Sequence, residues 1–189
     1  RSSGKMGECI ALELAHRGAK VKFISGPVAH LPNHPSIEVV KVKTAKEMHL
    51  EVTKAFPTCY AAILAAAVAD FTPKNVAVQK IKREGNNLSI ELEPTADIAK
   101  ELGNLKSKKQ VIVGFALETE NELANAKRKL ETKNLDFIVL NSANEEGAGF
   151  EVDTNKITIL HRNGESKEFP LKPKNQVAVD IVNELVGII

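Results

Sequence analysis

Residues 110–141 have the sequence QVIVGFALETENELANAKRKLETKNLDFIVLN, and this stretch decides the fold class. Its two ends, QVIVGFA (110–116) and LDFIVLN (135–141), are almost continuously apolar, which is typical of strands buried on both faces. Between them, residues 119–134 place apolar side chains at helical spacing. A strand, an amphipathic helix and a second strand predict a parallel βαβ unit.

The same alternation runs through the rest of the chain. Further strands are predicted at residues 20–25 and 60–70. Helices are predicted from the opening stretch to Gly18, over 44–56 with Thr44 and Glu47 as a capping box, over 97–103 with Asp97 as N-cap and Gly103 as stop, and over roughly 174–187. We therefore expect an α/β fold with a doubly wound, mostly parallel sheet in one domain spanning residues 1–189.

Two stretches break this alternation and predict antiparallel hairpins. Residues 79–94 carry Gly-Asn-Asn at their centre, and we expect this hairpin to project from the sheet. Residues 155–171 turn at Asn163-Gly164, a strong turn dipeptide, and we expect them to extend the sheet.

Composition excludes several classes of function. The 26 basic and 24 acidic residues give a net charge of +2, and the absence of Trp argues against a stacking platform for nucleic acids. No apolar run reaches the about 18 residues that a membrane helix needs. Cys9 and Cys59 lie in apolar stretches and predict reduced thiols in a cytoplasmic protein. The five histidines are scattered, so we expect no metal bound through His or Cys.

Ligands of open α/β sheets bind beyond the carboxyl ends of the strands, and AAAVAD (65–70) lies at such an end. Its alanines would let a nucleotide approach the main chain, and Asp70 would accept a hydrogen bond from the base or ribose. The alternative is a tight contact between a strand and a helix. If residues 80–83 are extended, Lys80 and Lys82 share one face and would reach phosphates. The alternative is an edge strand protected by charge.

Two further features carry cations or free backbone donors. Lys129 and Lys133 are four residues apart on one helix face, although lysines near a helix C-terminus also stabilise the macrodipole. SSGK (2–5) opens the first helix, where unpaired N–H groups suit a phosphate or carboxylate. Serine capping is the alternative, and the stretch lacks the Walker A pattern.

Taken together, the motifs resemble one known family. SSGKMG, RGAKV followed by SGP, AAAVAD, KIKR, GFALET and GAGF followed by DTNKITI occur in the order found in bacterial phosphopantothenoylcysteine synthetase. The resemblance covers essentially the whole chain. It implies a Rossmann-like core that joins 4′-phosphopantothenate to cysteine, with CTP as the activating substrate, an acyl-cytidylate intermediate and Mg²⁺ on the phosphates. It also implies a homodimer, with the antiparallel hairpins as its interface, and fusion or association with a flavin-dependent decarboxylase half.

The resemblance assigns site residues position by position. The phosphopantothenate and its carboxylate would lie beside Ser2, Ser3, Gly4 and Lys5. Lys80 would contact phosphate and support catalysis. The nucleotide would lie against Ala65, Ala66, Asp70, Lys80, Thr95, Ala96, Asp97, Ile98, Phe115, Lys129 and Lys133.

This sequence departs from the family pattern at three places. The family has an upstream strand ending in Gly-Pro-Thr and an asparagine two residues before Ser2, and without them we expect turnover to be lost. TADI (95–98) replaces the usual NPDI, and Arg83 replaces the last lysine of KIKK.

Two alternatives stay open at this point. One is a nucleotide-binding or dimerising fragment without turnover. The other is an NAD(P)-dependent short-chain dehydrogenase, which the sequence disfavours because residue 64, four after the single tyrosine Tyr60, is leucine rather than lysine. The strand at residues 20–25 also ends without the acidic residue that would hold an adenosine ribose.

Overall fold

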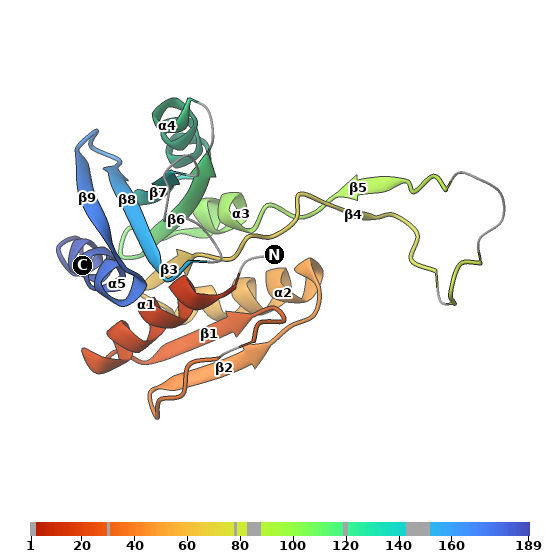
Figure 1. Ribbon diagram of the computed structural model, residues 1–189, viewed down its shortest axis with the longest axis horizontal. Helices are drawn as coiled ribbons and strands as arrows, with labels where there is room; N and C mark the ends of the chain where they lie inside the picture. Colours follow the sequence, from red (N-terminus) through yellow and green to blue (C-terminus); the bar gives the residue numbers. More distant parts are fainter. Residues whose placement is uncertain (1–2, 30, 78, 83–87, 119–120, 143–151) are drawn as a thin grey trace.

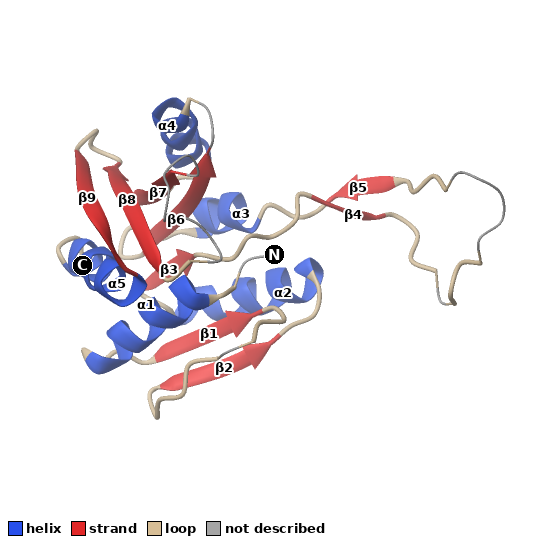
Figure 2. Cartoon of the chain, in the orientation of Figure 1, coloured by secondary structure: helices blue, strands red, loops and turns tan. Residues whose placement is uncertain are grey.

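A five-stranded mixed sheet forms the centre of the protein (Figures 1 and 2). In spatial order its strands are β3 (Ala61–Leu64), β6 (Val111–Glu118), β7 (Phe137–Ser142), β8 (Thr154–His161) and β9 (Ser166–Pro173). The first three are parallel, and β8 and β9 continue the sheet in antiparallel pairing. The structure is a computed structural model that describes all residues except 1–2, 30, 78, 83–87, 119–120 and 143–151.

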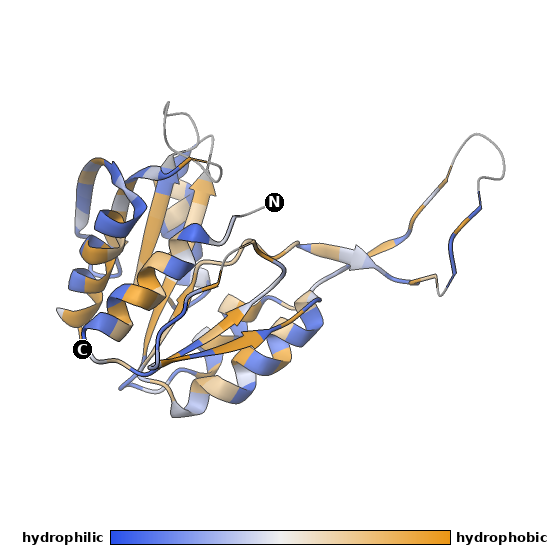
Figure 3. Cartoon of the chain, turned by 60° about the horizontal axis from the view of Figure 1, so that its bottom comes forward, coloured by the Kyte–Doolittle hydropathy of each residue, from blue (hydrophilic) through white to orange (hydrophobic). Residues whose placement is uncertain are grey.

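Helices cover both faces of this sheet. One face packs against α1 (Lys5–His16) and α5 (Lys174–Val186). The other packs against α3 (Ile98–Leu105) and α4 (Glu122–Thr132), with α2 (Ala45–Ala55) and the short 3₁₀ helix η1 (Phe56–Thr58) at its edge. Figure 3 shows hydrophobic residues along the central strands and hydrophilic ones on the outer helix surfaces. The predicted doubly wound arrangement is confirmed.

The central strands have apolar residues on both faces because alternate side chains point to opposite sides. Val113 and Val139 face α1 and α5, whereas Ile112 and Ile138 face α3 and α4. All four are essentially without exposed surface. This explains why the strand predictions at residues 110–116 and 135–141 depended on continuous apolar runs rather than on alternation.

A separate parallel pair lies beside the five-stranded sheet. It consists of β1 (Val21–Ser25), which was predicted, and β2 (Ile37–Lys41), which was not. Among the described residues, no strand pairing joins β1 to β3. Helix α1 lies over both, because Gly7 approaches the ring of Phe23 on β1 and the methyl group of Ala65 after β3.

An arm projects from the body of the protein between β3 and α3 (Figure 1). Its base is a short antiparallel pair, β4 (Phe71–Pro73) and β5 (Leu92–Pro94). The predicted hairpin over 79–94 therefore has wrong strand boundaries: its first strand lies earlier in the chain, and only its last residues pair. The second hairpin is confirmed, since β8 and β9 pair around Asn163-Gly164 and extend the sheet.

The helix termini follow their capping residues. Thr44 accepts a hydrogen bond from the Glu47 N–H (3.1 Å), and Asp97 accepts one from the Lys100 N–H (3.1 Å), as predicted. Gly103 does not stop its helix, which continues to Leu105. Instead, Gly103 lies where α3 touches the backbone at Lys133. None of the described helices is long and apolar enough to cross a bilayer.

Candidate functional site

The carboxyl end of β3 and the N-terminus of α3 come together at the base of the arm. Ala65, Ala66 and Asp70 follow β3, and Thr95 lies directly after β5, two residues before the N-cap of α3. The Thr95 hydroxyl donates to the Ala69 carbonyl (2.5 Å), and its N–H donates to the Asp70 carbonyl (2.9 Å). The two predicted nucleotide-binding stretches therefore form one continuous rim.

Asp97 joins this rim to α4. Besides capping α3, its Oδ1 lies 3.2 Å from the Nζ of Lys133, the residue at the C-terminus of α4. The Lys133 N–H donates to the Lys129 carbonyl (3.0 Å), so the two predicted lysines follow each other in the last turn of α4. Ala96 is exposed on the rim, whereas Ile98 is buried and packs in the core.

Phe115 lies on the opposite face of the sheet from Ile98. Its half-buried ring packs against the α1–α5 side, while Ile98 packs with α3 and α4. A ligand that contacts both residues therefore has to lie across the end of the sheet. This is the position at which doubly wound sheets bind ligands.

The opening turn faces the same end of the sheet. Ser2 lies outside the described residues, and Gly4 is the N-cap of α1 with φ of 79°. A Cβ at Gly4 would lie 2.8 Å from the Cγ1 of Val28, so both backbone angle and space require glycine. The Oγ of Ser3 lies 3.5 Å from the Lys5 N–H.

Lys5 is held by an acidic residue that sequence reasoning did not single out. Its Nζ lies 2.5 Å from the Oδ1 of Asp153, in the segment directly before β8. The Asp153 carbonyl in turn accepts the Lys174 N–H (2.9 Å) at the start of α5. The only sequence signal was the DTNKITI motif, whose role the resemblance left unassigned.

Lys174 and Cys9 lie close to Asp153. Lys174 is buried, and its ammonium donates to the Val152 carbonyl. Burial lowers the pKa of Lys174, and the nearby Lys5 charge lowers it further. Burial raises the pKa of the Cys9 thiol, with smaller contributions in the same direction from Glu8 and Asp153. Cys9 and Cys59 are free thiols, both half-buried.

The ion pair with Lys5 predicts a pH-dependent contact at the opening turn. The hydrogen bond from Lys5 lowers the pKa of Asp153, so the pair stabilises the folded state above the ordinary aspartate pKa of about 3.9. The contribution is lost as the pH falls through the lowered pKa. We expect Asp153→Asn to speed amide exchange in the first turn of α1 relative to wild type at pH 7, and the ratio of the two rates to approach one as the pH falls below the ordinary aspartate pKa, as measured by hydrogen-exchange NMR. A ratio of variant to wild-type exchange rates that stays the same at every pH would contradict this expectation.

The structure does not bring Lys80 to the rim within one chain. Lys80 is exposed in the arm between β4 and β5, and Figure 1 shows this segment leading away from the body. The prediction that Lys80 contacts the nucleotide therefore needs either a movement of the arm or a second copy of the chain.

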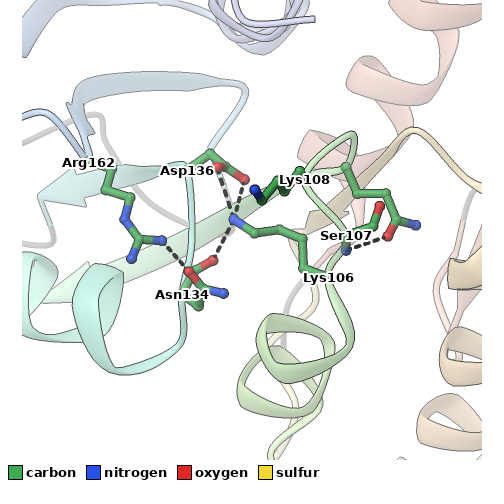
Figure 4. Close-up of a pocket in the computed structure, with 7 residues that line it drawn as sticks. Lys106, Ser107, Lys108, Asn134, Asp136 and Arg162 are labelled. Atoms are coloured by element: carbon green, nitrogen blue, oxygen red, sulfur yellow. Dashed lines mark hydrogen bonds and ion pairs between the residues drawn. The ribbon is translucent and has the colours of Figure 1, made fainter.

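A polar hollow of about 310 Å³ lies at the other end of the sheet (Figure 4). At its floor, the Lys106 ammonium donates to both carboxylate oxygens of Asp136 (2.9 and 3.0 Å). Asp136 also accepts the Ile112 N–H (2.7 Å), and Arg162 donates to the Asn134 side chain. These groups satisfy one another and tie α3 to the amino ends of β6 and β7, which indicates a structural role.

Metal binding has little support from protein side chains alone. Within the described part of the chain, no group of three His, Cys, Asp or Glu side chains is placed to hold a metal ion. Asp70 is an exposed carboxylate on the rim, whereas Asp97 is already engaged with Lys133 and the α3 backbone.

The chain matches proteins of pantothenate metabolism. A family model described as DNA/pantothenate metabolism flavoprotein C-terminal domain matches residues 1–188. The chain is 48% identical over 188 residues to a cysteine/cysteine sulfinic acid decarboxylase from an unknown prokaryotic organism, covering 100% of this chain and 52% of that protein. It is 40% identical over 188 residues to the coenzyme A biosynthesis bifunctional protein CoaBC of Bacillus subtilis strain 168, covering 100% and 46%. The chain thus spans about half the length of these relatives.

Solved structures confirm the fold. The crystal structure of the C-terminal domain of a CoaBC protein matches with a TM-score of 0.81 at 38% identity, covering 97% of this chain and 82% of that one. A Cab2 mutant in complex with phosphopantothenate-cysteine matches with a TM-score of 0.76, covering 99% of this chain and 78% of that one. The identity in the second case is 15%, so that match shows the fold alone.

Proposed function

Because this chain belongs to the family of DNA/pantothenate metabolism flavoprotein C-terminal domains, we propose that it joins 4′-phosphopantothenate to cysteine in coenzyme A biosynthesis. The observation that carries the proposal is the shared end of the sheet, where the rim of Asp70, Thr95 and Asp97 and the opening turn both lie. One edge thus offers separate places for a nucleotide and an acid. We place this activity in the cytoplasm.

In the first step, CTP activates the acid. A carboxylate oxygen of phosphopantothenate attacks the α-phosphorus, the bond to the bridging oxygen breaks, and pyrophosphate leaves with the electron pair. Both reactants are anions, so cations are needed to offset their repulsion. Lys133 and Lys129 at the rim provide this charge, and Lys80 adds more when it reaches the phosphates. Asp70 accepts a hydrogen bond from the nucleoside.

In the second step, the amine of cysteine attacks the acyl carbon. The bond from that carbon to the phosphate oxygen breaks, CMP leaves with the electron pair, and the nitrogen loses a proton. The opening turn supports this step because its backbone N–H groups and the positive end of α1 hold the acid in place.

Mg²⁺ would be held mainly by the triphosphate and water, with Asp70 as an available carboxylate. This agrees with the usual binding of Mg²⁺ through one or two carboxylates plus phosphates. The cation would neutralise phosphate charge in the first step.

The arm supports a homodimer as the working unit. An isolated two-stranded hairpin is marginally stable in water, and the arm carries many exposed large apolar residues. These are Phe71, Val76, Ile81, Leu88, Ile90 and Leu92. We propose that the arm packs on a second copy and carries Lys80 to the partner's rim.

The free edges of β1 and β3 support the expected upstream strand. Each strand has one edge without a strand partner among the described residues, which is where the expected upstream strand would pair.

Since the relatives are about twice as long as this chain, we propose that a decarboxylase half is fused to it or associates with it.

A cysteine decarboxylase is the second candidate, favoured by the name of the relative at 48% identity. We assign that name to the half of the relative that this chain does not cover. The two candidates differ in their requirement for a nucleotide.

The test is nucleotide-dependent pyrophosphate release by the full-length protein that carries this chain. With CTP, Mg²⁺ and phosphopantothenate, we expect pyrophosphate without cysteine, and CMP plus phosphopantothenoylcysteine once cysteine is added. ATP in place of CTP measures nucleotide preference. CO₂ release from cysteine without nucleotide would favour the second candidate for the whole protein. Binding of CTP without release of pyrophosphate would favour a nucleotide-binding fragment without turnover. Binding of NADH without binding of CTP would favour the dehydrogenase.

A further inference from the structure

Two buried asparagines at the candidate site have side-chain oxygens without a partner. Asn141 is 8% exposed and Asn155 is 5% exposed, and the Oδ1 atom of each is buried and accepts no hydrogen bond from the residues that the structure describes. Buried polar atoms in native proteins nearly always have partners, so such a pair calls for an explanation. Leucine would fill the same space without leaving an oxygen unpaired.

The two side chains are neighbours. Asn141 lies near the end of β7 and is paired with Ile157 of β8, and Asn155 lies two residues before Ile157. Asn141 lies two residues after Val139, and Asn155 lies two residues before Ile157. Successive side chains of a strand point to opposite faces, so both asparagines share the face of Val139 and Ile157, which packs against α1 and α5. Diagonal neighbours on adjacent strands are within reach of a common ligand.

The opening turn of α1 contacts Asn155. The Asn155 amide nitrogen lies 3.7 Å from the Sδ of Met6, which is a weak acceptor. The preceding residue, Lys5, is bound to Asp153. Met6 is unbranched and flexible, so it can move aside for a ligand group more readily than a branched residue. The oxygens are therefore next to the turn that would hold phosphopantothenate.

We propose that the Asn141 and Asn155 side-chain oxygens accept hydrogen bonds from the amino group of the amino-acid substrate. This inference rests on the proposed function and adds to it a site for cysteine. The oxygens can only accept, which excludes a phosphate or a carboxylate as their partner. They are also neutral, so unlike a carboxylate they do not strongly favour the ammonium form. The amine can thus be oriented while its lone pair stays free to attack.

The test compares Asn141→Leu and Asn155→Leu with wild type in the full-length protein. We expect each variant to raise the dissociation constant for L-cysteine at least about tenfold in isothermal titration calorimetry, since one good hydrogen bond is worth about that factor. Binding of 3-mercaptopropionate, which lacks the amine, should be the same in variants and wild type. Asn183→Leu on α5, which loses only a contact with Arg17, is the matched control and should bind cysteine normally.

A second measurement separates this inference from the proposed function. Exchange of pyrophosphate into CTP with phosphopantothenate requires no cysteine, and we expect it within about twofold of wild type in both variants. Exchange lost together with cysteine binding would show that the pair serves phosphopantothenate and would overturn the inference. The inference would also be overturned if the wild-type protein failed to bind cysteine, or if the leucine variants bound cysteine with the wild-type affinity. Absence of exchange in wild type, with asparagine-dependent cysteine binding, would refute the proposed function and keep the amino-acid site. If a leucine variant fails to fold, the alanine variant at the same position, Asn141→Ala or Asn155→Ala, replaces it.

Discussion

Lys80→Ala should lower the rate of pyrophosphate release by about 10²–10³-fold, the usual cost of removing one preorganised group that stabilises transition-state charge. Lys80 is exposed, and an exposed substitution of this kind leaves stability nearly unchanged. The thermal unfolding midpoint should therefore stay at the wild-type value. The rate is measured in the full-length protein at saturating CTP and phosphopantothenate.

A lysine on the same arm provides the control. Lys74 is also exposed, and its ammonium pairs with Glu91 across the arm (2.7 Å). Exposed pairs of this kind contribute little to stability, so Lys74→Ala should release pyrophosphate at close to the wild-type rate. Equal losses in both variants would mean that the arm acts through its general charge. An unchanged rate in Lys80→Ala would remove Lys80 from the mechanism.

Mixing two inactive variants shows whose site Lys80 serves. Lys133→Ala disables the rim but leaves the arm intact, while Lys80→Ala does the reverse. If the arm reaches a second copy, each mixed dimer has one complete site, and random reassociation restores about a quarter of wild-type activity. If the arm folds back onto its own rim, the mixture stays inactive.

The central sheet could be predicted from sequence because its strands are buried on both faces. Runs such as residues 135–141 contain little but apolar residues, and the intervening helices have clear stripes. β2 was missed because its side chains are only half-buried or exposed, so its sequence IEVVK has no strong pattern. The arm boundaries were wrong because β4 and β5 pair through the backbone over three residues and have mostly exposed side chains.

The site was predictable where local chemistry defines it. Asp97 was expected as an N-cap and caps α3, but its contact with Lys133 joins positions 36 residues apart that no local pattern relates. The same holds for Lys5 and Asp153, and for the two asparagines whose Oδ1 atoms have no partner among the described residues. Asn141 could be suspected from its position at a strand end, whereas Asn155 has no such signal because it is the second residue of an antiparallel strand.

Gly103→Ala should destabilise the protein by about 3 kcal/mol, the upper end of the usual cost of overpacking. A Cβ at this position would overlap the carbonyl oxygen of Lys133 and lie 2.9 Å from its carbonyl carbon. Neither side can easily give way. The Gly103 carbonyl accepts a hydrogen bond from the Asn134 side chain (2.7 Å), and Asn134 has φ of 52° in a tight turn before β7. At roughly 2–4 °C per kcal/mol for a chain of this size, the unfolding midpoint should fall by roughly 6–12 °C.

The same substitution should weaken nucleotide binding, because it separates the two elements that Asp97 and Lys133 connect at the rim. Gly187→Ala is the matched control: Gly187 has φ of −69°, and an added Cβ meets only ordinary contacts of 3.5 and 3.6 Å. We expect that variant to unfold at or slightly above the wild-type temperature, since alanine reduces the entropy of the unfolded chain. Calorimetry measures both stabilities, and titration with CTP measures binding. A Gly103→Ala protein as stable as the Gly187→Ala protein would show that α3 and the β7 turn are not packed as closely as described.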